Sequence, residues 1–243
     1  MADPAANLPL FFREIVPVDG ARHGALHLDR GRNYRFARET NAIPITLQEL
    51  AAVVGDYPIV FGGLAQPTML AIVGYRDREN LYIDAAGAWR RGAYVPAYVR
   101  NYPFALIEAP DKKALLLGFD PRAASVGMTG PALFAEAQPT AALSEAAELC
   151  KSLHQALQET ASFCAALEAK GLLVENNAVI DFKQGGQAVL RGFRVIDSGK
   201  FAALDDASVL DWRKRGWLAA VYAHFHAAAR WGRIVDLAAA ARA

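Results

Sequence analysis

Residues 140–171 read TAALSEAAELCKSLHQALQETASFCAALEAKG and carry one apolar stripe with alternating spacings of three and four. This spacing predicts a long helix that Thr140 caps and Gly171 ends. We expect the stripe to dock on a sheet. A coiled-coil seam that faces a partner is the alternative. The stripe consists of Leu143, Ala146, Cys150, Leu153, Leu157, Thr160, Cys164 and Leu167.

The segment before this helix is rich in short apolar runs joined by short connections, which favour antiparallel neighbours over helical crossovers. A short helix over 47–55 has Thr46 as its cap and Glu49 at the capping-box position. A second short helix is predicted over 95–101. The predicted strands are 57–61, 68–74, 81–84, 104–108 and 114–119.

Behind the long helix, 178–182 and 188–196 read as a hairpin with Gly185-Gly186 at its tip. Helices follow over 206–215 and 217–241, and Asp205-Asp206 fit the first helix start. We therefore predict an α+β protein whose largely antiparallel sheet is covered by the long helix and the C-terminal helices. After a flexible tail at 1–8, residues 9–243 form a single domain, strand-rich over 9–138 and helix-rich over 139–243.

The composition describes an ordinary globular protein, with 243 residues, 53% hydrophobic residues and a net charge of +1. This charge predicts no binding to nucleic acid or to an anionic membrane. No apolar run is long enough to span a membrane. Cys150 and Cys164 are about 21 Å apart along one helix, so they cannot form a bridge. Free thiols and an N-terminus without signal-peptide features predict a cytoplasmic protein.

The sequence contains no catalytic, metal-binding or cofactor-binding signature, so we predict no catalytic residue, metal or cofactor. A nucleophile elbow, a Walker lysine and a dinucleotide-binding glycine pattern are all absent. His23 and His27 are four residues apart, a spacing that would let both bind one metal ion if they lay on a helix. Their strand-like surroundings argue against a helix there. Asp84 and Asp120 each follow an apolar strand, but ordinary turn aspartates are more frequent there than catalytic pairs.

The segment 80–104 is the candidate binding site because it combines rigid aromatic residues with a few directional polar groups. Its aromatic members can line a concave site, and Arg100 can grip a carboxylate in a bidentate way. The alternative is a closed aromatic core in which Asn80 and Asp84 only form turns. The candidate ligand-binding residues are Asn80, Asp84, Trp89, Tyr94, Tyr98, Arg100 and Tyr102.

Several motifs in this region resemble the SapC family of bacterial proteins. They are Tyr57-Pro-Ile-Val-Phe, Asn80-Leu-Tyr-Ile-Asp with Gly87 and Trp89, and Tyr94-Val-Pro-Ala-Tyr-Val-Arg-Asn-Tyr-Pro-Phe. The likeness continues at Leu133-Phe134, Gly171-Leu-Leu, Leu190-Arg-Gly-Phe-Arg-Val-Ile-Asp, Gly216 and Tyr222-Ala-His. Asn101 departs from it, because the family pattern has a second basic residue there.

The resemblance implies a soluble accessory role beside uptake systems or oxygenases, and it brings no catalytic residues. The family is named for bacterial surface layers. Our first hypothesis is a non-catalytic protein that binds a peptide, a partner protein or a small molecule at 80–104. The second is an enzyme acting on a peptide or indole-like substrate, and the third is an oligomeric scaffold built through the 143–167 stripe. The oligomeric state stays open.

Overall fold

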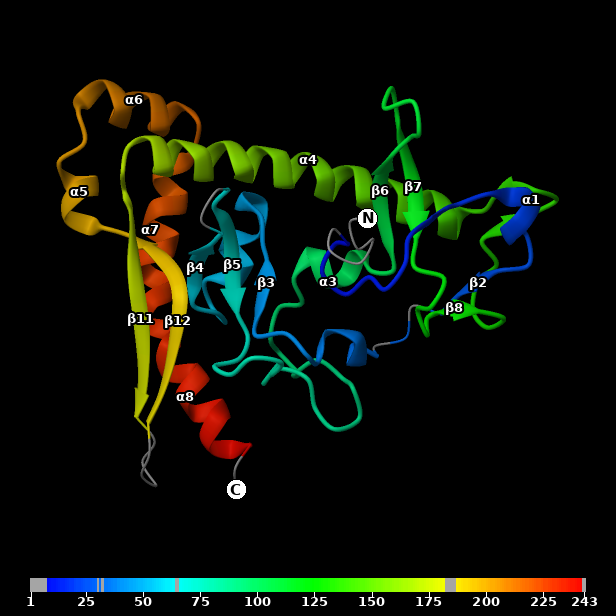
Figure 1. Ribbon diagram of the computed structural model, residues 1–243, viewed down its shortest axis with the longest axis horizontal. Coiled ribbons are helices and arrows are strands. Elements are labelled where there is room, and N and C mark those ends of the chain that lie inside the picture. Colours follow the sequence, from blue (N-terminus) through cyan, green and yellow to red (C-terminus); the bar gives the residue numbers. More distant parts are fainter. Residues whose placement is uncertain (1–7, 30, 32, 64–65, 182–186, 242–243) are drawn as a thin grey trace, which may run out of the picture. The chain divides into compact units, whose positions relative to one another are not determined.

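The computed structural model describes residues 8–29, 31, 33–63, 66–181 and 187–241 (Figure 1). The chain divides into two compact units. Unit 1 comprises residues 1–36 and 97–155, and unit 2 comprises residues 37–96 and 156–243. The predicted tail falls, except for Leu8, outside the described residues. The single domain with a strand-rich front and a helix-rich back stays a prediction.

Unit 1 is built around a three-stranded antiparallel sheet with the order β1-β7-β6. Strands β6 (Phe104–Glu108) and β7 (Leu115–Phe119) form the predicted hairpin, and β1 (Val16–Pro17) pairs with the end of β7. Smaller pieces complete the unit. They are α1 (Gly20–His23), β2 (His27–Leu28), η2 (Arg35–Ala37), α3 (Ala97–Asn101), β8 (Val126–Gly127), β9 (Phe134–Ala135) and β10 (Gln138–Pro139).

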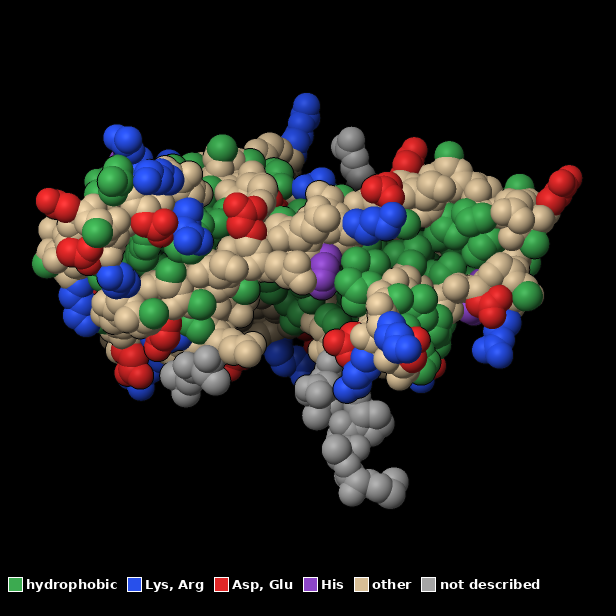
Figure 2. Space-filling view, turned by 90° about the horizontal axis from the view of Figure 1, so that it is seen from above, with side chains coloured by type: hydrophobic (Ala, Val, Ile, Leu, Met, Phe, Trp, Pro, Cys, Tyr) green, Lys and Arg blue, Asp and Glu red, His purple; other side chains and the backbone are tan. Residues whose placement is uncertain are grey.

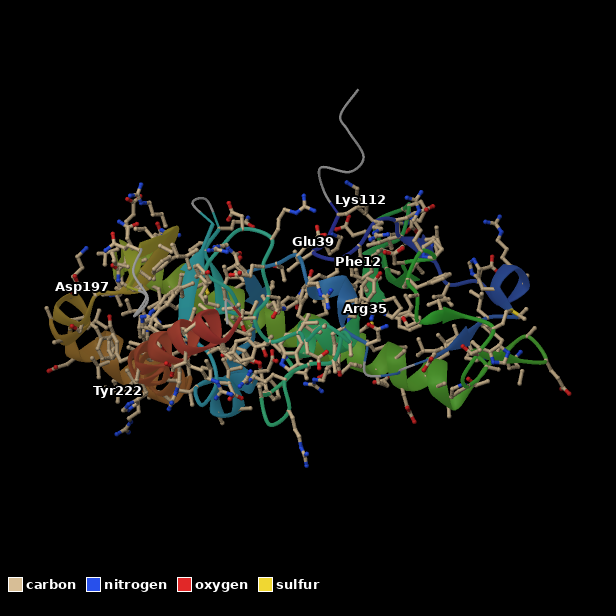
Figure 3. All side chains as sticks on the ribbon, turned by 90° about the horizontal axis from the view of Figure 1, so that it is seen from below. Phe12, Arg35, Glu39, Lys112, Asp197 and Tyr222 are labelled. Carbon is tan, nitrogen blue, oxygen red and sulfur yellow. The ribbon has the colours of Figure 1, made fainter. Side chains whose placement is uncertain are left out.

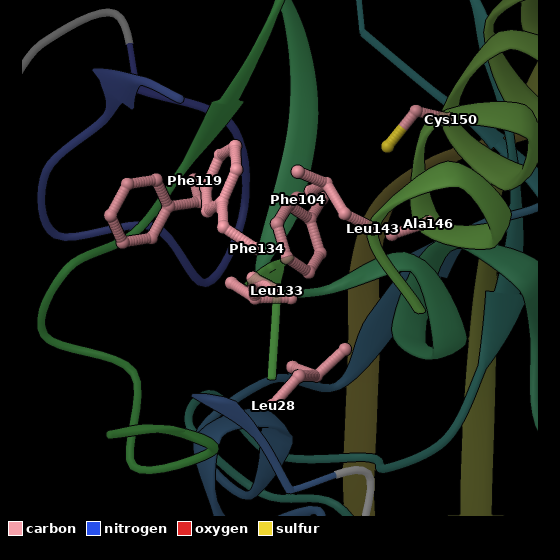
Figure 4. Packing of buried hydrophobic residues seen from close by; sticks show 8 residues of the cluster. All are labelled: Leu28, Phe104, Phe119, Leu133, Phe134, Leu143, Ala146 and Cys150. Carbon is pink, nitrogen blue, oxygen red and sulfur yellow. The ribbon is translucent and has the colours of Figure 1, made fainter. Parts of the chain in front are cut away.

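The core of unit 1 lies between this sheet and the first half of the long helix α4 (Ala141–Ala169). Figure 4 shows Phe104 and Phe119 from the sheet beside Leu133 and Phe134, with the side chains of α4 on the other side. All of these residues are at least nine-tenths buried. The cluster consists of Leu28, Phe104, Phe119, Leu133, Phe134, Leu143, Ala146 and Cys150.

Unit 2 contains a five-stranded sheet with the order β11-β12-β4-β5-β3, and every neighbouring pair is antiparallel. Figure 1 shows its β11–β12 hairpin lying along the helices α7 and α8. The predicted glycine tip of this hairpin lies outside the described residues. The strands are β3 (Ala42–Pro44), β4 (Ile59–Gly62), β5 (Thr68–Ile72), β11 (Leu173–Asp181) and β12 (Gln187–Ile196).

Helices cover the sheet of unit 2, as the sequence predicted. The capping box at Thr46 is confirmed, because the Glu49 carboxylate accepts from the Thr46 N–H at 3.0 Å. Asp205 caps α6 through the Ser208 N–H at 2.8 Å. The helical elements are η3 (Leu47–Glu49), α2 (Leu50–Val53), α5 (Ser198–Ala202), α6 (Asp206–Lys214), α7 (Trp217–Ala227), η4 (Ala228–Arg230) and α8 (Trp231–Ala240).

The long helix α4 confirms the central prediction, since its stripe packs inside the protein. Its first half belongs to unit 1 and its second half to unit 2. In unit 2, Cys164 and Leu167 of the stripe are at most 1% exposed. The ring of neighbouring Phe163 lies 6.5 Å from that of Phe61 in β4. Gly171 ends the helix with φ +64°, and the Leu172 N–H donates to the Leu167 carbonyl.

Three local predictions were wrong. Residues 81–84 form a turn with one isolated bridge between Ile83 and Trp89, because the Asn80 side chain accepts from the Tyr82 N–H. The predicted helix over 217–241 is divided by the 3-10 turn η4. The Thr140 hydroxyl donates to the Ala132 carbonyl at 2.6 Å and does not cap α4.

Among the described residues, no helix combines the length and the hydropathy needed to span a bilayer.

Candidate functional site

The candidate segment 80–104 crosses the boundary between the two units. Asn80, Asp84, Trp89 and Tyr94 belong to unit 2, whereas Tyr98, Arg100 and Tyr102 belong to unit 1. Each half has its own surroundings and is described separately. A single site formed by all seven residues stays a prediction.

In unit 2, Trp89 belongs to a hydrogen-bonded group of buried rings. Its side chain is 8% exposed, and its Nε1 donates to the Tyr57 hydroxyl at 3.0 Å. That hydroxyl donates in turn to the Tyr94 carbonyl. The Tyr57 and Tyr82 rings lie 4.6 Å apart, and burial raises the pKa of Tyr82 to about 12. Burial also raises the pKa of Tyr57 well above its ordinary value, so both phenols stay protonated.

Asn80 and Asp84 hold the turns at the two ends of the 81–84 segment. The Asn80 side chain accepts from the Tyr82 N–H at 2.9 Å and donates to the Ala37 carbonyl at 3.0 Å. The Asp84 carboxylate accepts from the Ala88 N–H at 2.9 Å. Asn80 is 6% exposed, whereas Asp84 lies on the surface. Both side chains therefore set the path of the backbone that carries Trp89.

Tyr94 connects this aromatic group to two carboxylates. Its hydroxyl donates to Glu49 at 3.0 Å, and its N–H donates to Asp56 at 2.8 Å. Asp56 also pairs with Arg233 from α8, with 2.8 Å between Oδ1 and Nη1. The carboxylates of Glu49 and Asp56 are thus paired with donors from Tyr94 and Arg233. This polar network fixes the unit 2 half of the segment in place.

In unit 1, Tyr98 and Tyr102 lie in a second aromatic group with residues from the N-terminal segment. The Tyr102 and Phe36 rings stack with centroids 4.2 Å apart, and Phe11 meets both tyrosines edge-on. Phe12 packs against Tyr102 at 5.2 Å. Burial raises the pKa of Tyr98 to about 12. Of these rings, Phe36 and Tyr102 also line a cavity together with Arg100, whereas Tyr98 is not in its lining.

Asp120 fixes Tyr102 in this position. The carboxylate is fully buried and accepts from the Tyr102 hydroxyl at 3.1 Å and the Arg13 N–H at 3.0 Å. Its second oxygen accepts from the Arg122 N–H at 2.9 Å. Burial, followed by the nearby Asp120 charge, raises the pKa of Tyr102 above its ordinary value. Asp120 therefore acts inside the unit as an acceptor for backbone and phenol donors.

Arg100 lines a cavity of about 270 Å³ that lies entirely within unit 1. Its floor is apolar and includes Leu28 and Phe104 of the core cluster, whose positions Figure 4 shows. Aromatic rings form part of the lining, and its polar side chains include exposed Asp29 and buried Asn101. In the part of the chain that the structure describes, the lining of the cavity thus combines Arg100 with aromatic and apolar side chains. Its further lining includes Asp29, Asn33, Tyr34, Phe36, Asn101, Tyr102, Ser125 and Leu149.

A comparison with protein-family models gives one match, to the family described as SapC, over residues 18–234. This range covers most of the chain and all seven candidate residues. The chain belongs to the SapC family. No curated protein and no solved structure matches it. Membership of the SapC family therefore confirms the resemblance, and the function has to be argued from the structure.

Asn101 is the position at which this SapC chain lacks the second basic residue that the resemblance implies. Its amide donates to the Phe104 carbonyl at 2.7 Å and closes the turn between α3 and β6. Asn101 is 9% exposed, and its Oδ1 accepts no hydrogen bond from a described residue. The side chain at position 101 is therefore a buried, uncharged amide. Of positions 100 and 101, only Arg100 brings a positive charge to the cavity.

Sequence reasoning missed the contribution of the first thirty-six residues to this cavity. Asp29, Tyr34 and Phe36 are far from Arg100 in the sequence, and the fold of unit 1 brings them to the same cavity. The segment Tyr34-Arg-Phe carries two of these side chains. Its two aromatic residues are the one signal in the sequence that could have pointed to this wall.

The structure also contains two apolar grooves that the sequence did not indicate. A groove of about 900 Å³ in unit 2 lies between α2 and α7, with Trp217 in its wall. Tyr222 of α7 also lines the groove and is 53% exposed, and Figure 3 labels its position. In unit 1, a groove of about 410 Å³ lies between β7 and α4. Figure 2 shows hydrophobic side chains, in green, lying between polar and charged ones on one face of the molecule.

The histidines do not form a metal site in the part of the chain that the structure describes. There, no group of three or more His, Cys, Asp or Glu residues is arranged to hold a metal ion. The His23 Nδ1 accepts from the Asp19 N–H at 3.0 Å, and its ring packs on Phe119. The His27 Nδ1 lies 2.7 Å from the Gly130 carbonyl. Each of these rings thus has a local structural partner.

Proposed function

We propose that this SapC-family chain is an accessory protein without catalysis of its own. In this proposal it binds a small ligand with an anionic group in the unit 1 cavity beside Arg100. The observation that carries the proposal is the combination of one arginine, aromatic rings and an apolar floor around a single cavity. Ligand pockets in proteins typically pair an apolar lining with a few placed polar groups, which is the composition seen here.

The volume of the cavity supports a small ligand rather than a large partner surface. About 270 Å³ is slightly below the usual range for drug-sized ligands, which begins near ~300 Å³. The rings around it are held by packing and by the bond from Tyr102 to Asp120. A wall that is already ordered loses little conformational entropy when a ligand binds.

A non-catalytic role is supported by the positions of the carboxylates. Asp120 is fully buried and is occupied by three donors, and Asp84 belongs to the other unit. General acid–base chemistry needs a titratable group within hydrogen-bond reach of the reacting atom. Among the described residues that line the cavity, Asp29 is the one carboxylate.

The first prediction is that small carboxylic acids bind the protein and that their amides bind at least tenfold more weakly. Arg100→Gln should weaken carboxylate binding by about tenfold or more, because a bidentate contact to a carboxylate is lost. Isothermal titration calorimetry with matched acids and amides measures both effects.

Arg22→Gln is the matched control, because Arg22 is an exposed arginine of unit 1 that pairs with Asp19 outside the cavity. This variant should bind like the unaltered protein. If no small carboxylic acid binds, or if Arg100→Gln binds them as tightly as Arg22→Gln does, the proposed site is wrong.

A further inference from the structure

We infer that the groove between α2 and α7 binds an acidic amphipathic helix of a partner protein. The described residues that line this groove of about 900 Å³ all belong to unit 2. None of them lines the unit 1 cavity beside Arg100, so the two sites are separate. The groove therefore adds a protein interface to the ligand site of the proposed function.

The groove exposes one face of α7 although this helix carries no Asp, Glu, Lys or Arg residue. Its sequence reads WLAAVYAHFHA. Ala219, Tyr222 and His226 follow one another at spacings of three and four, so they share a face. All three are exposed and line the groove. A helix with this composition is usually buried on all sides, so this face lacks the cover that its sequence predicts.

Tyr222 has the properties of an anchor for a partner. It is 53% exposed and is labelled in Figure 3. The rings of Phe201 and Phe225 meet its ring edge-on, with centroids 5.8 Å and 6.4 Å away. Tyrosine is enriched among the residues that dominate the binding energy of protein interfaces. A ring that its neighbours already hold loses little entropy when a partner covers it.

Two arginines of the groove lining flank α7. Arg215 precedes the helix, and its guanidinium carbon lies 4.8 Å from the centre of the Trp217 ring. Arg230 follows the helix, and its Nε donates to the Val54 carbonyl at 3.1 Å. These contacts hold one guanidinium group near each end of α7. The groove thus has an apolar middle with a positive charge toward each end.

Carboxylates do not balance these two charges within the groove. Among the described residues that line it, Glu159 is the one carboxylate, and it accepts from the Gln48 side chain. Asp211 pairs with Arg215 at 2.9 Å, but both side chains are about half exposed, and surface pairs of this kind contribute little. Charge complementarity therefore predicts Asp or Glu residues beside the apolar stripe of the partner.

The walls of the groove favour a helix over a strand or an acyl chain. An added strand needs a sheet edge with unpaired backbone groups, whereas α2 and α7 bond their backbone internally. A small ligand is typically buried over about 70–90% of its surface. Exposed Ala51 and Ala219 in the lining show that this groove is open to solvent. A helix laid between two helices buries its apolar stripe and keeps its polar side in water.

The length of α7 sets the length of the partner segment. From Trp217 to His226 the helix extends about 14 Å, at ~1.5 Å per residue. A partner helix of about three turns covers this distance. Isolated helices shorter than about 12–15 residues are only marginally stable in water, so a test peptide needs about eighteen residues.

The second prediction compares three synthetic peptides of this length. The first carries leucines along one helical face and glutamates beside them. The second has lysines in place of the glutamates, and the third has the composition of the first in scrambled order. In fluorescence anisotropy at about 0.15 M salt, the first peptide should bind at least tenfold more tightly than either of the others. Tyr222→Ala should weaken its binding about tenfold, because an interface anchor is lost.

Charge reversal at one arginine tests where the peptide binds. Arg215→Glu should weaken the glutamate peptide at least tenfold and strengthen the lysine peptide, because like charges then meet opposite ones. Arg213→Glu is the matched control, since Arg213 is an exposed arginine of α6 that does not line the groove. It makes the same change in net charge and should leave the preference for the glutamate peptide unchanged.

Equal binding of the glutamate and lysine peptides to the unaltered protein overturns the inference, whether or not the variants fold. An equal response of Arg213→Glu and Arg215→Glu overturns it as well, because the peptide then binds outside the groove. Two further results also contradict an acidic helix. One is that dodecanoate binds while no peptide does. The other is that no peptide binds and the protein forms a dimer in sedimentation that Tyr222→Ala dissociates. The titrations with Arg100→Gln test the unit 1 cavity separately from all of these outcomes.

Discussion

At the scale of single residues, His224 shows how burial changes the chemistry of a side chain. It lies in α7, is 6% exposed, and its Nε2 accepts from the Ile196 N–H of β12 at 3.2 Å. The Phe61 ring lies 5.4 Å away. Burial disfavours the imidazolium, and the pKa of His224 falls from its ordinary value to about 4. The neutral ring therefore joins the helix to the sheet.

The third prediction is that stability falls as the pH is lowered from about 6.5 to about 4. The unfolded chain binds a proton at His224 in this window and the folded chain does not, so acid favours unfolding. The stabilisation is complete above the unfolded pKa and is lost as the pH approaches the folded value of about 4. The shift corresponds to about 3 kcal/mol. Urea unfolding followed by tryptophan fluorescence at several pH values measures it.

His224→Gln should remove most of this pH dependence while leaving an oxygen that can accept from Ile196. His226→Gln is the control, because His226 is exposed on the same helix. It should retain the full slope. A slope in the His224→Gln protein equal to that of the control would show that another group is responsible.

At the scale of helices and strands, regular patterns were predictable and side-chain turn chemistry was not. The 3-4 stripe of α4 predicted a packed helix, and Thr46 with Glu49 predicted the start of η3 and α2. By contrast, residues 81–84 have strand-forming side chains but follow Asn80. The Asn80 amide bonds the backbone at Tyr82 and at distant Ala37, and the second contact is invisible in the sequence. A tertiary bond therefore overrides local β-propensity.

The fourth prediction concerns the end of α4. Gly171 has φ +64°, a conformation that costs about 1 kcal/mol for a residue with a Cβ. Gly171→Ala should therefore destabilise the protein by about 1 kcal/mol, although a Cβ there has open space around it. Chemical unfolding followed by circular dichroism gives the change in free energy.

Gly232→Ala is the matched control, since Gly232 lies inside α8 and a Cβ there also has open space. Alanine is the better helix former, so this change should stabilise the protein by about 0.5–1 kcal/mol. The two substitutions are chemically identical and are expected to have opposite signs. Equal effects at both positions would contradict the role assigned to the left-handed backbone.

At the scale of the whole molecule, the sequence could indicate the candidate residues but not how the chain distributes them. Pro96 and Ala97 are neighbours in sequence, yet they belong to different units. The aromatic density of 80–104 predicted one site, and the seven residues of this prediction are distributed over the two units. The residues that line the same cavity as Arg100 include Asp29 and Phe36, and only long-range folding brings them there. Composition cannot reveal such contacts.

The fifth prediction tests whether the two units unfold as one domain, as the sequence analysis expects. All tryptophans of the chain, Trp89, Trp212, Trp217 and Trp231, belong to unit 2, so their fluorescence reports on that unit alone. Phe119→Ala removes a buried ring from the core of unit 1 and should cost about 3–5 kcal/mol. In a single domain this loss lowers the urea midpoint seen by fluorescence as much as the midpoint seen by circular dichroism.

Phe163→Ala is the control, because Phe163 is fully buried in unit 2 beside Trp212 and Trp217. Phe163→Ala should lower the fluorescence midpoint whether the two units unfold together or independently. If Phe119→Ala leaves the fluorescence midpoint unchanged and moves only part of the circular dichroism signal, the units unfold independently. In that case one half of helix α4 unfolds while the other half stays folded. The helix then has to break near residues 155–156, where it passes from one unit to the other. A shared midpoint instead means that the unbroken helix couples the folding of unit 1 to the stability of unit 2.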